Sequence, residues 1–318
     1  LAKIDWNITN LQRLSLTYRR TDSLAPNYAN GSTYTQFSGN AYQSNRINDN
    51  LSLQLNSSWT ANLRTETALS ASKYNGTASL YEPLAPEIYV NGVNGTNLTT
   101  GAVVTNGQLD LGTNHSYQFN QLYTKNYNGH LYADYSLGDH TIKFGADFDK
   151  TIVTDVFVQY YAGLYGFASP AAFAAGTPNY VRYQQASPGF TIPQANYYYS
   201  SPDKGLLLQD TWRPAANLSF VGGVRFDYPS FPTKPLYLPA FQAAFGIPNN
   251  TVPDGNYTIA PRLGFNYKLP EQLTGRFKVQ VRGGIGLFRG TNPSVWVGNA
   301  YGNTGALNSV ISGSSNAS

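Results

Sequence analysis

The sequence predicts an all-β protein whose antiparallel strands form the wall of a transmembrane β-barrel. Three observations predict this fold: apolar and polar residues alternate along the chain, short and long connections follow each other in turn, and aromatic residues recur beside the short connections. Charged residues make up only 12% of the 318 residues, whereas 25 residues are tyrosine. This aromatic content is unlike that of a disordered chain.

Alternation with a period of two places successive side chains on opposite faces of a strand. Between residues 46 and 59 all the even positions are polar, and most of the odd positions are apolar, as in Leu51, Leu53 and Leu55. The same pattern recurs at residues 13–19, 117–135, 142–149, 218–227, 262–267 and 277–287. We count ten strand candidates. Two of them, 35–59 and 117–135, exceed the roughly 9–11 residues that cross a bilayer, and we expect them to project beyond it.

The connections between these strands alternate in length. Short connections are expected at residues 9–10, 60–62, 137–139, 213–217 and 268–275, and long polar stretches at roughly 21–34, 75–115, 157–200 and 229–256. Because consecutive strands are antiparallel, all short connections lie at one end of the sheet. Outer-membrane barrels have this asymmetry, with short periplasmic turns and long extracellular loops. A soluble sandwich has no reason to show it.

Aromatic residues stand at or next to the last apolar-face position before the short turns. The four residues concerned are Trp59, Tyr135, Trp212 and Tyr267. Aromatic rings with a polar tip prefer the membrane–water interface. We therefore expect these rings to form an aromatic girdle at the periplasmic rim, the alternative being that they cap the core of a sandwich.

The third long stretch is rich in tyrosine. A rigid apolar ring that makes one hydrogen bond suits sugars and peptides. The candidate ligand-binding residues are Tyr160, Tyr161, Tyr165, Tyr197, Tyr198 and Tyr199. Packing within the loop and in an outer girdle is the alternative, which we favour. Residues 168–175 and 240–245 are expected to form short helices within the loops.

Polar residues on the other strand face are expected to line the interior of the barrel. The candidates are Arg225, Asp227, Arg262 and Arg282. The simplest expectation is that the arginines pair with Asp227 and other groups of the wall. Asp147 and Asp149 fall on the same inward face.

No pattern for catalysis or for a cofactor emerges. The sequence has no cysteine, and its three histidines lack metal-ligand spacing. Gly284 and Gly286 could begin a phosphate-binding loop, but we expect Thr291-Asn292-Pro293 to prevent the helix that such a loop needs. The net charge of +4 is diffuse, unlike the clustered charge of nucleic-acid binders. We expect no enzyme activity, no cofactor, no metal and no nucleic-acid partner.

Several segments of the sequence resemble segments of a known family. The segment from Gly205 to Trp212, followed by Asn217-Leu218 and by Gly222 to Tyr228, resembles a barrel hairpin of TonB-dependent outer-membrane transporters. The segment 260–267 resembles the next downward strand, and 137–145 fits the same barrels. The stretch 283–305 is similar to the Oar-like branch, large receptors with an N-terminal carboxypeptidase-regulatory-like domain. The resemblance extends over about residues 115–305.

This resemblance implies a 22-stranded barrel around a plug domain in the outer membrane of a Gram-negative bacterium. It also implies capture of a large ligand by outer loops, passage past the plug, and energy supplied through TonB. Inward arginines could then pair with plug carboxylates. We expect residues 1–318 to be a partial barrel, with the plug, the N-terminal domain and the remaining strands outside them. The expected partners are membrane lipid, the rest of the same protein and the TonB complex.

Two other interpretations remain open from the sequence. One is a complete small outer-membrane barrel of ten strands, either an adhesin or an enzyme. The other is a soluble secreted β protein that binds carbohydrate. Ten strands leave little interior space, whereas the inward face is rich in Asn, Ser, Gln and Gly, which suits a wet interior.

Overall fold

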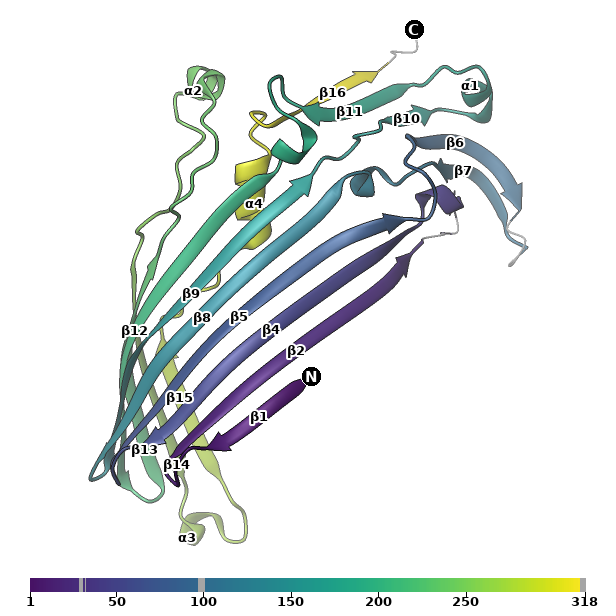
Figure 1. Cartoon of the computed structure of the whole chain (residues 1–318). Helices are drawn as coiled ribbons and strands as arrows, with labels where there is room; N and C mark the ends of the chain where they lie inside the picture. The colour runs from purple at the N-terminus through teal and green to yellow at the C-terminus, as the bar shows by residue number, and fades with distance from the viewer. Residues whose placement is uncertain (29–30, 32, 97–100, 315–318) are drawn as a thin grey trace.

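The computed structural model describes residues 1–28, 31, 33–96 and 101–314, which form two sheets (Figure 1). The larger sheet has ten strands in the order β1-β2-β4-β5-β8-β9-β12-β13-β14-β15, and every neighbouring pair is antiparallel. Its strands are β1 (Ala2–Asn7), β2 (Gln12–Asn27), β4 (Tyr42–Ser58), β5 (Leu63–Leu80), β8 (Asn120–Leu137), β9 (His140–Phe157), β12 (Tyr197–Ala215), β13 (Leu218–Pro229), β14 (Thr258–Lys268) and β15 (Gln280–Gly286). The expected antiparallel sheet of ten strands is confirmed.

The connections of this sheet alternate in length as expected. Short turns occupy residues 8–11, 59–62, 138–139, 216–217 and 269–279, the last of which contains α3 (Glu271–Thr274). The long connections gather at the opposite end of the tall, curved sheet (Figure 1). Gly138 takes a φ of 56° in its two-residue turn, a left-handed conformation that glycine adopts at little cost.

One face of the ten-stranded sheet is apolar and uncovered. Leu53, Leu131 and Leu208 are all more than a third exposed, although each lies within a long strand. Register places such residues side by side, for example Leu14 against Leu55. An uncovered apolar face of this size suits contact with lipid. Within the described residues, no helix is long and apolar enough to cross a membrane.

The smaller sheet is built from the long connections and the last described segment. Its order is β16 (Asn308–Ser314), β11 (Tyr180–Ala186), β10 (Leu164–Phe167), β6 (Glu87–Thr96), β7 (Val103–Leu111) and β3 (Tyr34–Gln36). The pairs β6–β10 and β3–β7 are parallel. The expectation that these stretches are polar loops was therefore incomplete, because short strands far apart in sequence pair across them.

A buried carboxylate holds two of these connections together. Glu87 is 1% exposed, and its two oxygens lie 2.6 Å from Asn40 Nδ2 and 2.5 Å from His115 Nδ1. The backbone N–H of His115 also donates to Glu87, at 2.8 Å. Burial is the main reason that the pKa of the nearby Asp110 carboxyl lies above its ordinary value. We call Asn40, Glu87 and His115 the Glu87 clip.

Several predicted boundaries differ from the structure. The strand expected over 35–59 begins at Tyr42, because η1 (Ser38–Asn40) interrupts it and Tyr34–Gln36 pair in the smaller sheet. The strand expected over 117–135 begins at Asn120, after η2 (His115–Tyr117). The helices expected at 168–175 and 240–245 are confirmed as α1 (Pro170–Ala174) and α2 (Pro239–Phe245).

The expectation that no helix follows Thr291-Asn292-Pro293 is wrong. Helix α4 (Ser294–Gly302) begins directly after Pro293. Proline is tolerated at a helix start, where its missing N–H would have had no helical partner. Seven irregular residues, 287–293, separate β15 from α4, so a tight strand-to-helix phosphate loop is still not formed.

Candidate functional site

The inward face of the ten-stranded sheet carries a network of charges centred on Arg225. Its guanidinium donates to both oxygens of Asp147, at 2.7 Å each, and to Asp227 at 2.8 Å. Tyr132 donates to the same Asp147 carboxylate at 2.9 Å. These bidentate, charge-assisted bonds are among the stronger hydrogen bonds of proteins.

The network crosses β12 because of a glycine. Gly205 on β12 lies opposite Asp147 on β9 and opposite Asp227 on β13. A Cβ atom at Gly205 would overlap the Arg225 guanidinium and the Asp147 carboxylate. A side chain at position 205 would have to displace both groups, so the glycine leaves Arg225 room to cross β12 and reach Asp147.

Further charges surround a hollow of about 530 Å³ on the inward face, which we call the charged hollow. The ionisable side chains that line it are Asp149, Asp203, Asp227, Arg225, Arg262 and Arg289. Arg289 pairs with Asp203, and the Arg262 guanidinium lies 4.5 Å from the centre of the Phe288 ring. Three arginines and three aspartates balance one another, so the hollow carries little net charge.

Helix α4 lies against the inward face of the sheet, beside β12 (Figure 1). The Tyr197 ring occupies the space that side chains at Gly298 and Gly302 would need. Tyr199 OH donates to the Ser294 carbonyl at 3.2 Å, and its ring packs with Tyr301. Residues 294–302 are thus folded onto the concave side instead of extending outward.

A second hollow, of about 430 Å³, separates α4 from β8 and β9; we call it the amide groove. Its walls are the even positions 120–126 of β8, the odd positions 151–157 of β9, Tyr197, and Ser294, Val295 and Asn299 of α4. Asp155 Oδ2 accepts a hydrogen bond from Tyr197 OH at 2.6 Å. The groove contains no Lys, Arg or His.

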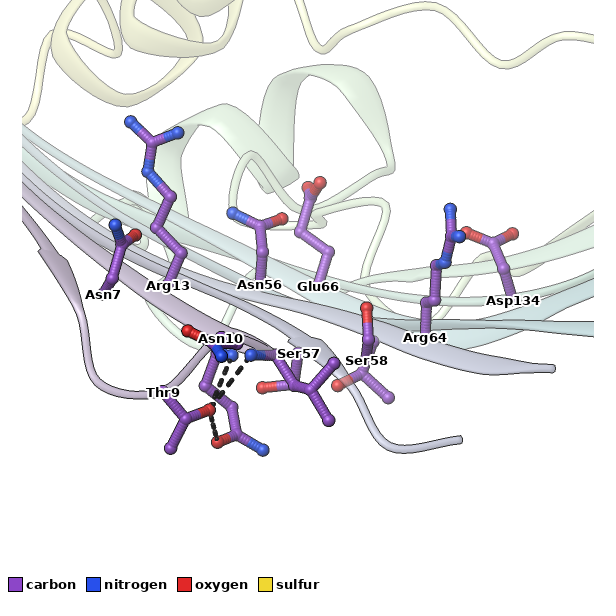
Figure 2. Close-up of a pocket in the computed structure, with 13 residues that line it drawn as sticks. Asn7, Thr9, Asn10, Arg13, Asn56, Ser57, Ser58, Arg64, Glu66 and Asp134 are labelled. Carbon is purple, nitrogen blue, oxygen red and sulfur yellow. Dashed lines mark hydrogen bonds between the residues drawn. The ribbon is translucent and has the colours of Figure 1, made fainter. Parts of the chain in front are cut away.

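A third hollow, of about 530 Å³, lies at the short-turn end, and we call it the rim hollow (Figure 2). Figure 2 shows that its long polar side chains point to the same side of the sheet, the inward side: Asn7, Arg13, Asn56, Arg64, Glu66 and Asp134. The Thr9 hydroxyl accepts the backbone N–H groups of Leu11 and Gln12, both at 3.1 Å, which fixes the first turn.

The six tyrosines proposed for ligand binding do not form one cluster. Tyr160 stacks on His115, Tyr161 meets Phe119 edge to face, and Tyr165 contacts Tyr183. Each of these three rings packs within the outer connections.

The assignment of the other three tyrosines to a loop is wrong, because Tyr197, Tyr198 and Tyr199 begin β12. Tyr197 and Tyr199 point inward against α4. Tyr198 lies on the opposite face and is 47% exposed. A strand starting at Tyr197 was missed because the three consecutive rings give no alternation.

The four aromatics expected at the periplasmic rim stand at the short-turn end. Tyr135, Trp212 and Tyr267 lie near the ends of β8, β12 and β14, and Trp59 directly follows β4. The Trp212 ring stacks on Phe220 and on His140, whose Nδ1 lies 2.6 Å from Asp210 Oδ2. Their contact with a membrane interface stays a prediction.

The four residues expected to face inward do so by register, and they differ in their partners. Arg225 pairs with Asp227, as the simplest expectation had it, and also with Asp147. Arg262 lies over Phe288, whereas Arg282, opposite Asn266 on β14, is exposed. Alternation could place these side chains on a face, but it could not reveal the pairing across Gly205.

No group of three or more His, Asp or Glu residues that could hold a metal ion occurs in the part of the chain that the structure describes. Each histidine instead lies beside one carboxylate: His115 beside Glu87, His130 beside Glu66, and His140 beside Asp210. Sequence reasoning missed Glu87, Asp155 and α4, for which no periodic signal exists.

Comparison with known proteins shows a family and a similarity to a solved structure. A family model described as "Outer membrane beta barrel domain" matches residues 1–318. Among solved structures, the chain is similar to "Copper transporter OprC", at 12% sequence identity and a TM-score of 0.47, over 85% of this chain and 34% of that one. The chain thus spans about a third of the length of that structure. No curated protein matches the sequence.

Proposed function

Since the chain belongs to the outer membrane beta-barrel domain family, we propose that it is part of the wall of a TonB-dependent receptor of the Oar-like branch. The protein resides in the outer membrane of a Gram-negative bacterium. The Oar-like assignment is supported by the resemblance of residues 283–305 to that branch. The ligand would be large, and uptake and export are both compatible with the proposal.

The observation that carries the proposal is the polar inner face of an open sheet. The first and last strands of the sheet order, β1 and β15, do not pair with each other. Because lipid does not tolerate unpaired strand edges, we propose that further strands of the full-length protein close the barrel, to 22 in total. A complete ten-stranded barrel, the second outer-membrane alternative, would instead pair β1 with β15.

The hollows on the inner face support a role in binding and passage, with no enzyme activity and no cofactor. The rim hollow lies at the short-turn end, which we assign to the periplasm, where a plug domain would meet Arg13, Arg64, Glu66 and Asp134. The long connections and the six-stranded sheet lie at the other end, where a ligand would first arrive. The family assignment disfavours the soluble secreted alternative.

A TonB interaction experiment tests this function. We would express the full-length protein that carries this chain, confirm its outer-membrane location by fractionation, and measure its binding to the purified periplasmic domain of TonB. We expect binding that is lost when the N-terminal segment before the plug is deleted. A correctly inserted protein that does not bind TonB would contradict the proposal.

A further inference from the structure

We propose that the amide groove binds a neutral oligosaccharide. The groove lies between α4 and the inward face of β8 and β9, and it holds about 430 Å³. This inference rests on the proposed receptor function, since it names the class of ligand that such a receptor would take.

Polar and apolar side chains stand side by side along most of the groove. Three of the four cross-strand pairs on its wall combine one polar and one apolar residue: Asn120 with Phe157, Leu122 with Asp155, and Thr124 with Val153. The fourth pair, Asn126 with Thr151, is polar. A sugar ring likewise presents a hydroxyl rim and an apolar C–H face, so it needs both kinds of contact at each step. Ligand sites combine an apolar lining with a few placed polar groups in this way.

The lining of the groove carries little charge. Asp155 is its only carboxylate, and no Lys, Arg or His lines it, so an anionic ligand would find no cation. Thr124, Asn126 and Asn299 provide hydroxyl and amide groups. Such groups donate to and accept from hydroxyls without requiring a charge on the ligand.

The groove contains a carboxylate oxygen that has no hydrogen-bond donor in the described part of the chain. Asp155 Oδ2 accepts from Tyr197 OH, but the buried Oδ1 atom has no hydrogen-bond partner among the described residues. A buried acceptor left without a partner is costly. A small rotation of the Asp155 carboxylate would bring Oδ1 within reach of a ligand hydroxyl in the groove, which would then supply the missing donor.

Contacts of α4 with the sheet and with the connection 230–257 hold the groove open. The Tyr197 ring fills the notch above Gly298 and Gly302, and Tyr199 OH is bonded to the Ser294 carbonyl. Tyr301 OH donates to the Thr233 carbonyl at 2.5 Å at the other end of α4. A preformed site loses less conformational freedom on binding than a flexible one.

The neighbouring charged hollow provides the contrast. Arg225 pairs with Asp227 and with the adjacent Asp147, and Arg289 pairs with Asp203. A ligand there would have to break these pairs. No ion pair lies among the described residues that line the amide groove.

The test is a binding titration with the full-length protein in detergent micelles. The probes are maltohexaose, cellohexaose and xylohexaose, with spermidine as a cationic probe. We expect at least one oligosaccharide to bind. Asp155→Asn should weaken that binding about tenfold, which is the loss of one good hydrogen bond, and Thr124→Val should weaken it severalfold while keeping the side-chain shape.

The matched control is Asp149→Asn, the same chemical change on the same face of β9 but in the charged hollow. It should leave oligosaccharide binding within about twofold of the wild type. Binding of none of the three oligosaccharides, binding of spermidine alone, or binding unchanged in both groove variants would overturn the inference. TonB binding with no oligosaccharide binding would overturn this inference and leave the receptor function standing, and the reverse result would overturn only the receptor function.

Discussion

The two sheets of the molecule place their apolar and polar side chains in opposite ways. In the ten-stranded sheet, Leu206 and Leu208 are 57% and 53% exposed, and the charges face the concave side. In the six-stranded sheet, the apolar Val90 and Leu164 are buried, at 2% and 3% exposure. The first pattern suits a wall between lipid and water, and the second suits a structure surrounded by water.

The pairing of the strands differs as well. Five of the nine neighbouring pairs in the ten-stranded sheet are joined by short turns. Most pairs keep one register throughout, for example Tyr42–Ser58 of β4 against β5, and the register shifts once between β12 and β13. In the six-stranded sheet the strands come from distant connections, and the β6–β7 register shifts twice. The ten-stranded sheet is therefore expected to survive changes that loosen the six-stranded one.

The largest effect is expected from Arg225→Ala. The variant leaves Asp147 and Asp227 on the inward face without their cation, and removing one partner of a largely buried ion pair costs about 3 kcal/mol or more. Urea unfolding of the full-length protein in lipid vesicles would measure this cost. Arg282→Ala, which removes an exposed inward arginine, is the control. An equal loss of folding stability in both variants would show that the ion pairs of Arg225 contribute no more than an exposed arginine does.

The next largest effect tests whether the outer face of the ten-stranded sheet meets lipid. Leu53 is apolar and exposed on β4, five residues from its short-turn end. An arginine facing the middle of the bilayer costs about 2–4 kcal/mol, so Leu53→Arg should lower folding stability by that amount. Val310→Arg, at a more exposed apolar position on β16 of the six-stranded sheet, should change it by less than about 0.5 kcal/mol. Similar effects at both positions would remove the distinction between the sheets.

A smaller and local effect is expected from Glu87→Ala. Asn40 and His115 would lose the carboxylate that they share, at a cost of about 1–3 kcal/mol. Limited proteolysis should then cut the long connections faster while the ten-stranded sheet stays intact. Glu82→Ala, at an exposed position nearby, should not change the cutting pattern, and loss of the whole barrel in Glu87→Ala would mean that the two sheets unfold as one.

The smallest effect is pH-dependent and confined to the connection 230–257. The Phe231 backbone N–H donates to Asp254 at 2.6 Å, and this bond, helped by Ser230, lowers the pKa of the Asp254 carboxyl below its ordinary 3.8. The stabilisation is therefore complete above about pH 4 and is lost as the pH falls through the lowered pKa.

Hydrogen exchange at the Phe231 amide, referred to an unstructured peptide at each pH, measures this change. Protection should be greater at pH 5 than at pH 3 in the wild type, and the difference should be much smaller in Asp254→Asn. Equal protection at both pH values in the wild type would refute the assignment.

Much of the ten-stranded sheet could be predicted from the sequence, because local alternation and turn length determine it. The alternation of apolar and polar residues around Leu51 and Leu53 was enough to assign both side chains to one face of the sheet. The six-stranded sheet could not be predicted, since β10 pairs with a strand more than 70 residues away and neither carries a periodic signal. Helix α4 was missed because Pro293 was interpreted as a breaker although it precedes the first turn.

The inward residues were predictable only in part. Alternation placed Arg225, Asp227 and Arg262 on one face, but the partner of an arginine depends on which strands become neighbours and on what lies between them. Asp155 illustrates the limit, because its role depends on Tyr197 and on a helix that lies about 140 residues later in the chain.

Gly205 has a mechanical consequence. One guanidinium fastens β9 to β13 across the strand between them, so the load on the β12–β13 hairpin is shared with a third strand. When the protein is pulled out of a membrane from one end, hairpins normally leave in succession. Here β9, β12 and β13 should resist together and give way in a single larger step, and filling the gap at Gly205 with a methyl group should divide that step into smaller ones.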